Sequence, residues 1–177
     1  NQSLKALLGA VSEPSESSVT ARVVADTGGS FAQSVLILAG TVDGAGKGDI
    51  VLTGEGLVGR ITQAGRRSSR VLLITDINSR IPVLVGEAGS HAILAGDNSL
   101  RPKLLYMDGA SPVLTGDKVV TSGDGDAFPT GLPVGRIARI KDGVIEVEPY
   151  VARDQLRHVK IADYGLSGVL GELARER

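Results

Sequence analysis

Residues 134–149, VGRIARIKDGVIEVEP, carry the clearest structural signal in this chain. Two runs rich in branched aliphatic residues are separated by Asp142-Gly143. An Asp-Gly pair suits the two-residue turn of a β-hairpin, because both turn positions need a positive φ. We therefore expect two antiparallel strands, 133–141 and 144–149, joined by this turn.

The same pattern extends toward the start of the chain and to residue 162. From residue 19 onward, short runs of branched residues alternate with Gly, Asp, Asn and Pro, and the chain holds 24 glycines. Many short strands with regular turn signals are typical of a barrel or a sandwich. The expected strands are 19–26, 34–39, 50–53, 57–63, 70–75, 80–86, 91–95, 102–107, 118–122, 133–141, 144–149 and 156–162.

A motif also occurs twice. Residues 48–54, GDIVLTG, are echoed by residues 116–122, GDKVVTS, and GLVGRI at 56–61 is echoed by GLPVGRI at 131–137. The later copy carries an additional loop, 123–130. Repetition at this distance indicates two related structural units. Twelve strands divide naturally into two sets of six.

The two ends of the chain have a different pattern. Leu4, Leu7, Leu8 and Val11 follow helical spacing, and Pro14 ends the segment. Either a packed N-terminal turn or the last turns of a coiled coil, with those four residues in self-association, fits this stripe. The chain begins without Met, so we expect a fragment whose signal or anchor is missing. The tail, 163–177, suggests a short amphipathic helix or a frayed end.

Composition limits the possible functions. Hydrophobic residues make up 42% and charged residues 22%, the net charge is −1, and there is no cysteine. These values indicate a folded domain without disulfides or thiolate chemistry. No apolar run in the sequence comes close to the length of about 18 residues that a membrane-spanning helix needs. Five aromatic residues and no net positive charge argue against binding of nucleic acid.

No catalytic or metal-binding pattern stands out. A serine-protease triad needs Ser, His and a carboxylate in hydrogen-bond reach, and the chain offers only His91 and His158, with Ser122 outside a Gly-Asp-Ser-Gly motif. Asp124 and Asp126 fall short of a calcium loop and fit a solvated turn. The cluster Arg66, Arg67 and Arg70 fits a solvated face. We expect no enzyme activity, no metal and no cofactor.

Some apolar residues fall in expected loops or at strand ends, where exposure is costly. Either they plug the barrels or one or two of them form a contact surface for a partner. These candidate partner-binding residues are Leu57, Tyr106, Met107 and Phe128.

Five strings occur in order along the chain: GLVGRI at 56–61, SRVLLITD at 69–76, SRIPV at 79–83, VTSG at 120–123 and FPTGLPVG at 128–135. Together they resemble the rod shape-determining protein family MreC, from about residue 19 to residue 161. At 124–127 the chain, with DGDA, is more acidic than the usual family loop.

The resemblance implies an all-β fold of two six-stranded β-barrels, distantly trypsin-like in shape, after a short helix left from a coiled coil. It suggests that one barrel is inserted in the other. The expected organisation is a coiled-coil end and linker at 1–18, one barrel from 19–48 with 115–162, a second barrel from 49–114, and the tail at 163–177. A sequential split near 86–90 fits the strand count equally well.

The resemblance also implies a function. It indicates a non-catalytic scaffold of the bacterial cell-elongation complex, located in the periplasm and anchored to the inner membrane by a missing N-terminal segment. The implied partners are a class B penicillin-binding transpeptidase, MreD, MreB and RodA, together with a second copy of the chain in a dimer or a filament. The alternative is a catalytically degenerate or cryptic serine-hydrolase-like barrel protein.

Overall fold

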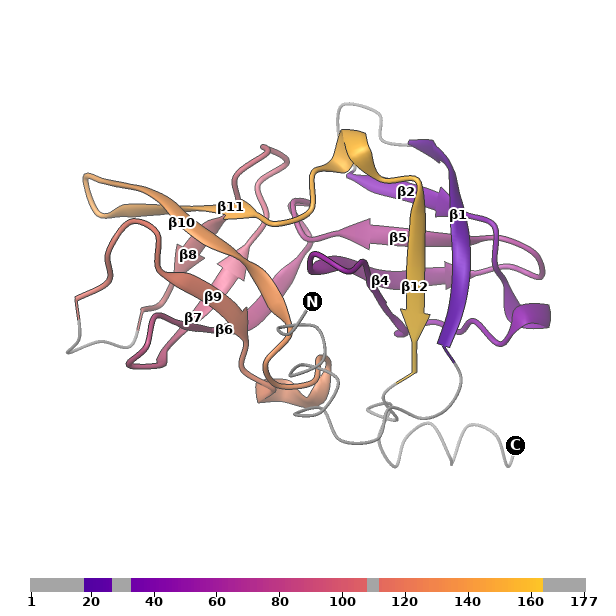
Figure 1. Ribbon diagram of the computed structural model, residues 1–177, viewed down its shortest axis with the longest axis horizontal. Coiled ribbons are helices and arrows are strands. Elements are labelled where there is room, and N and C mark those ends of the chain that lie inside the picture. The colour runs from indigo at the N-terminus through magenta and orange to yellow at the C-terminus, as the bar shows by residue number, and fades with distance from the viewer. Residues whose placement is uncertain (1–17, 27–32, 108–111, 164–177) are drawn as a thin grey trace.

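The computed structural model describes residues 18–26, 33–107 and 112–163 (Figure 1). The predicted helix with Leu4, Leu7, Leu8 and Val11, and the tail from residue 164, lie outside these residues. The described part contains twelve strands and three short 3-10 helices. The strands are β1 (Ser18–Asp26), β2 (Ser34–Ile37), β3 (Ile50–Leu52), β4 (Leu57–Ala64), β5 (Ser69–Leu73), β6 (Arg80–Val85), β7 (Ser90–Ala95), β8 (Lys103–Leu105), β9 (Lys118–Thr121), β10 (Pro133–Lys141), β11 (Val144–Pro149) and β12 (His158–Ala162).

These strands form two closed, six-stranded antiparallel barrels, which confirms the predicted fold class (Figure 1). Barrel 1 has the order β1-β12-β3-β4-β5-β2, and barrel 2 has the order β10-β11-β8-β7-β6-β9. Along most strands, inward residues are buried and outward residues are exposed, as the two-residue period of a strand requires. Closure leaves neither sheet with an unpaired edge.

The two halves of the chain, β1–β6 and β7–β12, exchange their last strands. β6 follows β5 of barrel 1 directly, but it pairs with β7 and β9 in barrel 2. In the same way β12 follows β11 of barrel 2, but it pairs with β1 and β3 in barrel 1. Each barrel is therefore completed by a strand from the other half.

The repeated motif forms the same corner in both barrels. The backbone N–H of Gly48 donates to the carbonyl oxygen of Ile61, and that of Gly116 donates to Ile137, both at 2.8 Å. The next residue in each copy, an aspartate, accepts a hydrogen bond from the N–H three residues before it, at 2.8 and 2.9 Å. Because these bonds match one for one, the duplication inferred from sequence is present in the structure.

The predicted barrel boundaries are wrong. An insertion is present, but the inserted barrel spans 80–149 rather than 49–114, and β3, β4 and β5 belong with β1 and β2. The predicted boundaries, at 48/49 and 114/115, lie at or next to the two copies of the Gly-Asp motif. Those copies precede β3 and β9, which are equivalent strands in the middle of each unit, so a boundary there cuts both barrels in two.

The barrels share part of their apolar core. One cluster lies inside barrel 1, around Ile37, Val71 and Ile161. The other fills barrel 2 and extends across the contact between the barrels, because Ile50 and Leu57 of barrel 1 belong to it. The two-barrel body is thus held by continuous packing as well as by the exchanged strands. None of the helices in the described ranges is long and apolar enough to cross a membrane.

Candidate functional site

Ser122, Asp124 and His91 lie together on the surface of barrel 2, but they are not arranged as a catalytic triad. The Ser122 hydroxyl donates to Asp124 Oδ2 at 2.9 Å, and His91 Nδ1 lies 3.0 Å from the same oxygen. A triad needs a hydroxyl bonded to an imidazole that the carboxylate orients from its other side. Here the carboxylate stands between the serine and the histidine.

The same contacts set the acidity of Asp124. The hydrogen bond from Ser122, and after it the one from His91, lower the pKa of this carboxyl below its ordinary value of 3.8. Both favour the charged form of a group whose side chain is 60% exposed. The cluster therefore closes the loop onto β7 as a local surface contact.

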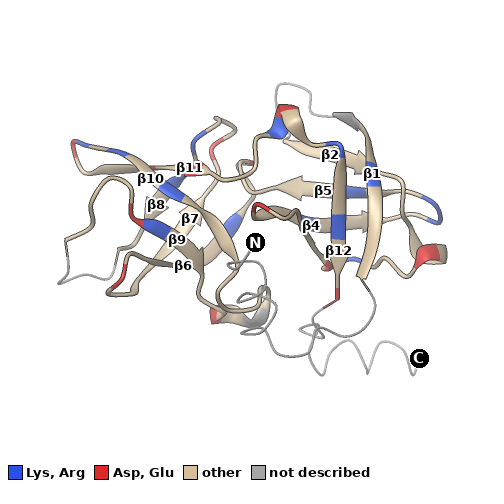
Figure 2. Cartoon of the chain, viewed as in Figure 1, with Lys and Arg blue, Asp and Glu red and all other residues tan. Residues whose placement is uncertain are grey.

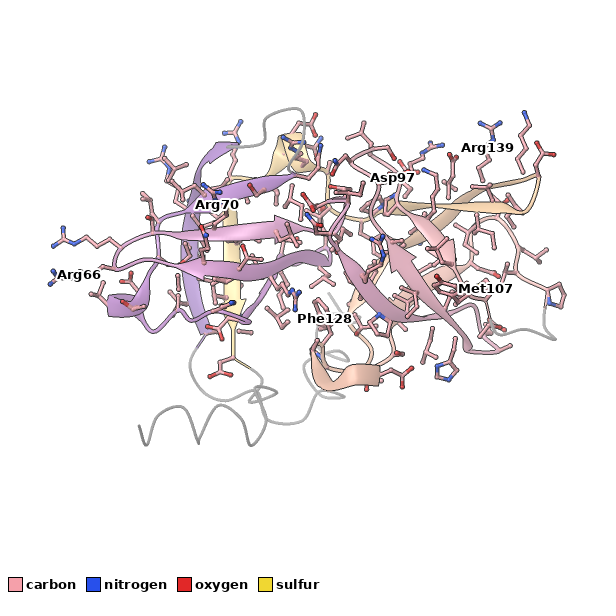
Figure 3. All side chains as sticks on the ribbon, turned by 180° about the vertical axis from the view of Figure 1, so that it is seen from behind. Arg66, Arg70, Asp97, Met107, Phe128 and Arg139 are labelled. Atoms are coloured by element: carbon pink, nitrogen blue, oxygen red, sulfur yellow. The ribbon has the colours of Figure 1, made fainter. Side chains whose placement is uncertain are left out.

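The structure separates the four residues predicted to contact a partner. Leu57 and Phe128 are 1% and 4% exposed and belong to the core that the barrels share. As partner contacts of the folded protein, these two predictions are wrong. Met107 is partly buried against the same core, and Tyr106 is 83% exposed. Figure 3 places Phe128 near the junction of the barrels and Met107 on barrel 2.

Phe128 is buried because its loop folds back on β9. The Thr121 hydroxyl donates to the carbonyl oxygen of Pro129, and it also accepts the N–H of Leu132 at 2.9 Å. The N–H of Gly131 donates to the carbonyl of Thr121 at 2.8 Å. These bonds hold the end of the loop against β9, so Phe128 of the extra loop points into the core while Asp124 stays on the surface.

Tyr106 belongs to an exposed apolar surface, which we call the apolar end. The register pairs Ile145 with Leu104, which sets Val144 opposite the outward Leu105. The tip of the β10–β11 hairpin and residues 112–117, which lead into β9, both lie at the end of barrel 2 away from barrel 1 (Figure 1). The apolar end comprises Leu105 (37% exposed), Tyr106 (83%), Leu114 (66%) and Val144 (47%), with Ile140 (41%) on the opposite face of the hairpin tip, where it pairs with Ile145.

Sequence reasoning found only Tyr106 among these five residues. Ile140 and Val144 flank the Asp142-Gly143 turn, and their exposure follows from their position at a hairpin tip. The exposure of these two residues could have been predicted from the hairpin sequence, because both lie beside the predicted turn. Leu105 and Leu114 had no comparable signal, because their exposure depends on how the β8–β9 connection leaves the barrel.

A polar cluster joins the two barrels where they meet. The buried carboxylate of Asp76 accepts the backbone N–H of Gln33 at 2.7 Å and that of Asn78 at 2.7 Å. The Gln33 amide nitrogen donates to the carbonyl of Asn98, and its oxygen accepts a hydrogen bond from Arg153. Four segments distant in sequence, two from each half of the chain, meet here, so the angle between the barrels is fixed.

Next to this cluster a groove of about 610 Å³ runs between barrel 1 and the β11–β12 connection. Its walls are largely aliphatic, with Val24 and Leu100 exposed on the two sides. This concave surface is a second candidate contact for an apolar segment of a partner. In the described parts of the chain, no group of three or more acidic, His or Cys residues is placed to hold a metal ion.

Comparison with known proteins decides the family. Residues 23–163 match the family described as "Rod shape-determining protein MreC, barrel core". The chain belongs to the MreC family. It is 44% identical over 161 residues to the cell shape-determining protein MreC of Caulobacter vibrioides, covering 91% of this chain and 46% of the relative. It is 48% identical over 135 residues to that of Cereibacter sphaeroides, covering 76% of this chain and 45% of the relative.

Solved structures agree with this assignment. The crystal structure of MreC from Pseudomonas aeruginosa has a TM-score of 0.77 at 29% identity, covering 82% of this chain and 99% of that one. A complex between penicillin-binding protein PBP2 and MreC from Helicobacter pylori shares the fold, with a TM-score of 0.64 at 16% identity, over 84% of this chain and 99% of that one. The chain spans about half the length of the curated relatives it matches.

Proposed function

We propose that this chain is a non-catalytic scaffold of the bacterial cell-elongation complex, and that it binds a penicillin-binding transpeptidase through the apolar end of barrel 2. The observation that carries the proposal is the exposure of Tyr106, at 83%, with Leu105 and Val144 beside it. Tyr is among the residues most often found at the energetic centre of protein interfaces. Membership of a family described as rod shape-determining supports the cellular role.

The transpeptidase is the partner best supported by comparison. The MreC of Helicobacter pylori forms a complex with PBP2, and the same two-barrel body is present here. We further propose MreD, MreB and RodA as members of the assembly, self-association into a dimer or filament, and a periplasmic location with an inner-membrane anchor outside this chain.

A scaffold of this kind acts by population shift. If the rigid two-barrel body binds one conformation of the transpeptidase more tightly than another, it raises the occupancy of that conformation by the ratio of the two affinities. The fixed angle between the barrels favours such selection, because a rigid surface loses little conformational entropy on binding.

The test compares charge insertion at matched exposed positions. We expect Tyr106→Glu to weaken binding of the transpeptidase's periplasmic part about 30-fold, since loss of a central aromatic contact costs about 2 kcal/mol. Ile77→Glu, at an apolar side chain that is 50% exposed on the β5–β6 connection, is the control and leaves affinity unchanged. Affinity is measured by biolayer interferometry, and folding by the thermal transition.

Leu100→Glu distinguishes the groove from the apolar end. Leu100 is 75% exposed on the groove wall. If Leu100→Glu abolishes binding while Tyr106→Glu does not, the groove is the contact surface and the apolar end is not. If a fluorophosphonate probe labels the chain and Ser122→Ala removes the label, the scaffold assignment itself is wrong.

A further inference from the structure

The far end of barrel 1 carries four arginines that have no partner in the described part of the chain. Arg22, Arg66, Arg67 and Arg70 are exposed and form no ion pair or side-chain hydrogen bond there, and the ion pairs that do form lie in barrel 2. Figure 2 shows Lys and Arg on this end, and Figure 3 shows Arg66 at its extremity with Arg70 nearer the barrel wall. Unpaired cations concentrated at one end create a local positive field in a chain of net charge −1.

Two exposed aliphatic side chains stand among these arginines. The backbone N–H of Leu38 donates to the carbonyl of Arg22 at 2.9 Å, and that of Val42 donates to Arg66 at 3.2 Å. Leu38 is 52% exposed and Val42 is 59% exposed. Together with the four arginines, they form what we call the basic end.

The basic end is built rigidly. The backbone of Gly40 lies so close to the β4–β5 turn that a Cβ there would stand 2.4 Å from the carbonyl oxygen of Arg66. The Ser69 hydroxyl donates to the carbonyl of Ala39 at 2.7 Å. The segment that carries Leu38 and Val42 is therefore fixed against the turn that carries Arg66 and Arg67. One acidic side chain, Asp43, lies on this segment, and it accepts the N–H of Gly40.

We propose that the basic end binds the surface of an anionic phospholipid membrane, separately from any anchor. The guanidinium groups reach lipid phosphates, which they bind with paired hydrogen bonds. Leu38 and Val42 enter the boundary between headgroups and acyl chains, the position that exposed aliphatic residues take in interfacial proteins. Each cation near an anionic bilayer raises the partition coefficient about fivefold.

Other anionic partners fit this surface less well. Single-stranded nucleic acid is bound by stacking on aromatic rings, and the described aromatic residues, Tyr106, Phe128 and Tyr150, all lie in barrel 2 or directly after it. A soluble polyanion or an acidic protein would pair with the arginines, but it would leave the exposure of Leu38 and Val42 without a role. If a soluble anionic partner were the true ligand, the wild-type chain would not sediment with anionic vesicles in the test below.

The experiment is co-sedimentation of the 177-residue chain with vesicles of one part phosphatidylglycerol to two parts phosphatidylcholine. We expect binding that weakens with salt and is absent on pure phosphatidylcholine. Arg66→Glu with Arg67→Glu lowers the partition coefficient at least about 25-fold, from two fivefold contributions. Lys118→Glu with Lys141→Glu reverses the same number of exposed charges on barrel 2 and leaves binding unchanged. The thermal transition of each variant checks folding.

A second pair of variants tests insertion. Leu38→Ser with Val42→Ser weakens vesicle binding but leaves binding to heparin unchanged, because only the membrane uses the aliphatic side chains. The proposal is overturned if the wild-type chain does not sediment with anionic vesicles, or if the arginine variant binds as the wild type does. It is also overturned if the Leu38 and Val42 variant binds vesicles normally, because the arginines would then act by charge alone and the two aliphatic side chains would not enter the membrane.

Discussion

Gly59 of β4 and Gly135 of β10 are equivalent positions in the two barrels. At both, the backbone of the neighbouring strand occupies the space that a Cβ atom would need. A Cβ at Gly59 would lie 1.9 Å from the carbonyl oxygen of Leu72, and one at Gly135 would lie 2.3 Å from that of Glu148. Both glycines sit shortly before a β-bulge in their strand. The close approach lets each barrel bend tightly enough to close.

Gly59→Ala and Gly135→Ala should each destabilise the chain, because the added methyl group meets backbone atoms that cannot move aside. Overpacking of this kind costs about 1–3 kcal/mol. The matched control is Gly46→Ala, where a Cβ meets Asp49 at 3.8 Å, an ordinary contact. Urea unfolding measures the difference, and equal midpoints for Gly59→Ala and Gly46→Ala would contradict the close approach.

Asp76→Ala should lower stability by about 2–4 kcal/mol, because it leaves the N–H groups of Gln33 and Asn78 without their acceptor at a buried position. Asp154→Ala, at an exposed position of the β11–β12 connection, is the control and should change stability by less than about 0.5 kcal/mol. Chemical unfolding of both variants provides the measurement. A cost at Asp76 no larger than that at Asp154 would mean that the polar cluster does not hold the barrels.

Cutting the chain in the β6–β7 turn should leave both barrels intact. After cleavage at a protease site inserted between Glu87 and Ala88, the first fragment still supplies β6 to barrel 2 and the second still supplies β12 to barrel 1. We expect the fragments to elute together in size-exclusion chromatography and to separate only in denaturant. Elution as two separate species in native buffer would argue against the strand exchange.

The pKa of Asp124 should rise toward 3.8 in Ser122→Ala, because the hydroxyl that stabilises its charged form is removed. A carboxyl whose pKa is lowered by folding contributes stability above its unfolded pKa and loses it as pH falls through the lower, folded value. The contribution of Asp124 is thus complete at neutral pH and disappears only in acid. NMR titration of the carboxyl carbon reports the pKa, and an unchanged value in the variant would contradict the bond.

The strands were predictable from sequence because their pattern is local. The twelve predicted runs correspond to the twelve strands, and the turn at Asp142-Gly143 joins β10 to β11 as expected. Branched residues and glycines at short intervals are enough to locate strands that are buried on one face. The equivalent corners at Gly48 and Gly116 were likewise predictable, because the Gly-Asp motif that forms them is repeated in the sequence.

The assignment of strands to barrels was not predictable in the same way. Which barrel receives β6 depends on long-range pairing with β9, and a strand's own residues do not specify this partner. The burial of Leu57 and Phe128 has a similar origin. Leu57 faces outward from barrel 1 but is covered by barrel 2, and Phe128 is buried by the hydrogen bonds of Thr121. Contacts between domains leave little trace in a local pattern.

The exchange of β6 and β12 has a mechanical consequence. The barrels are joined by two covalent connections, residues 74–79 and 150–157, each of which runs from a strand of one barrel to a strand of the other. A force that pulls the barrels apart acts on both connections, and beyond their reach it must strip β6 or β12 out of a closed sheet, breaking its hydrogen bonds on both sides. Tension applied at one barrel would therefore reach a protein held at the other through two parallel connections.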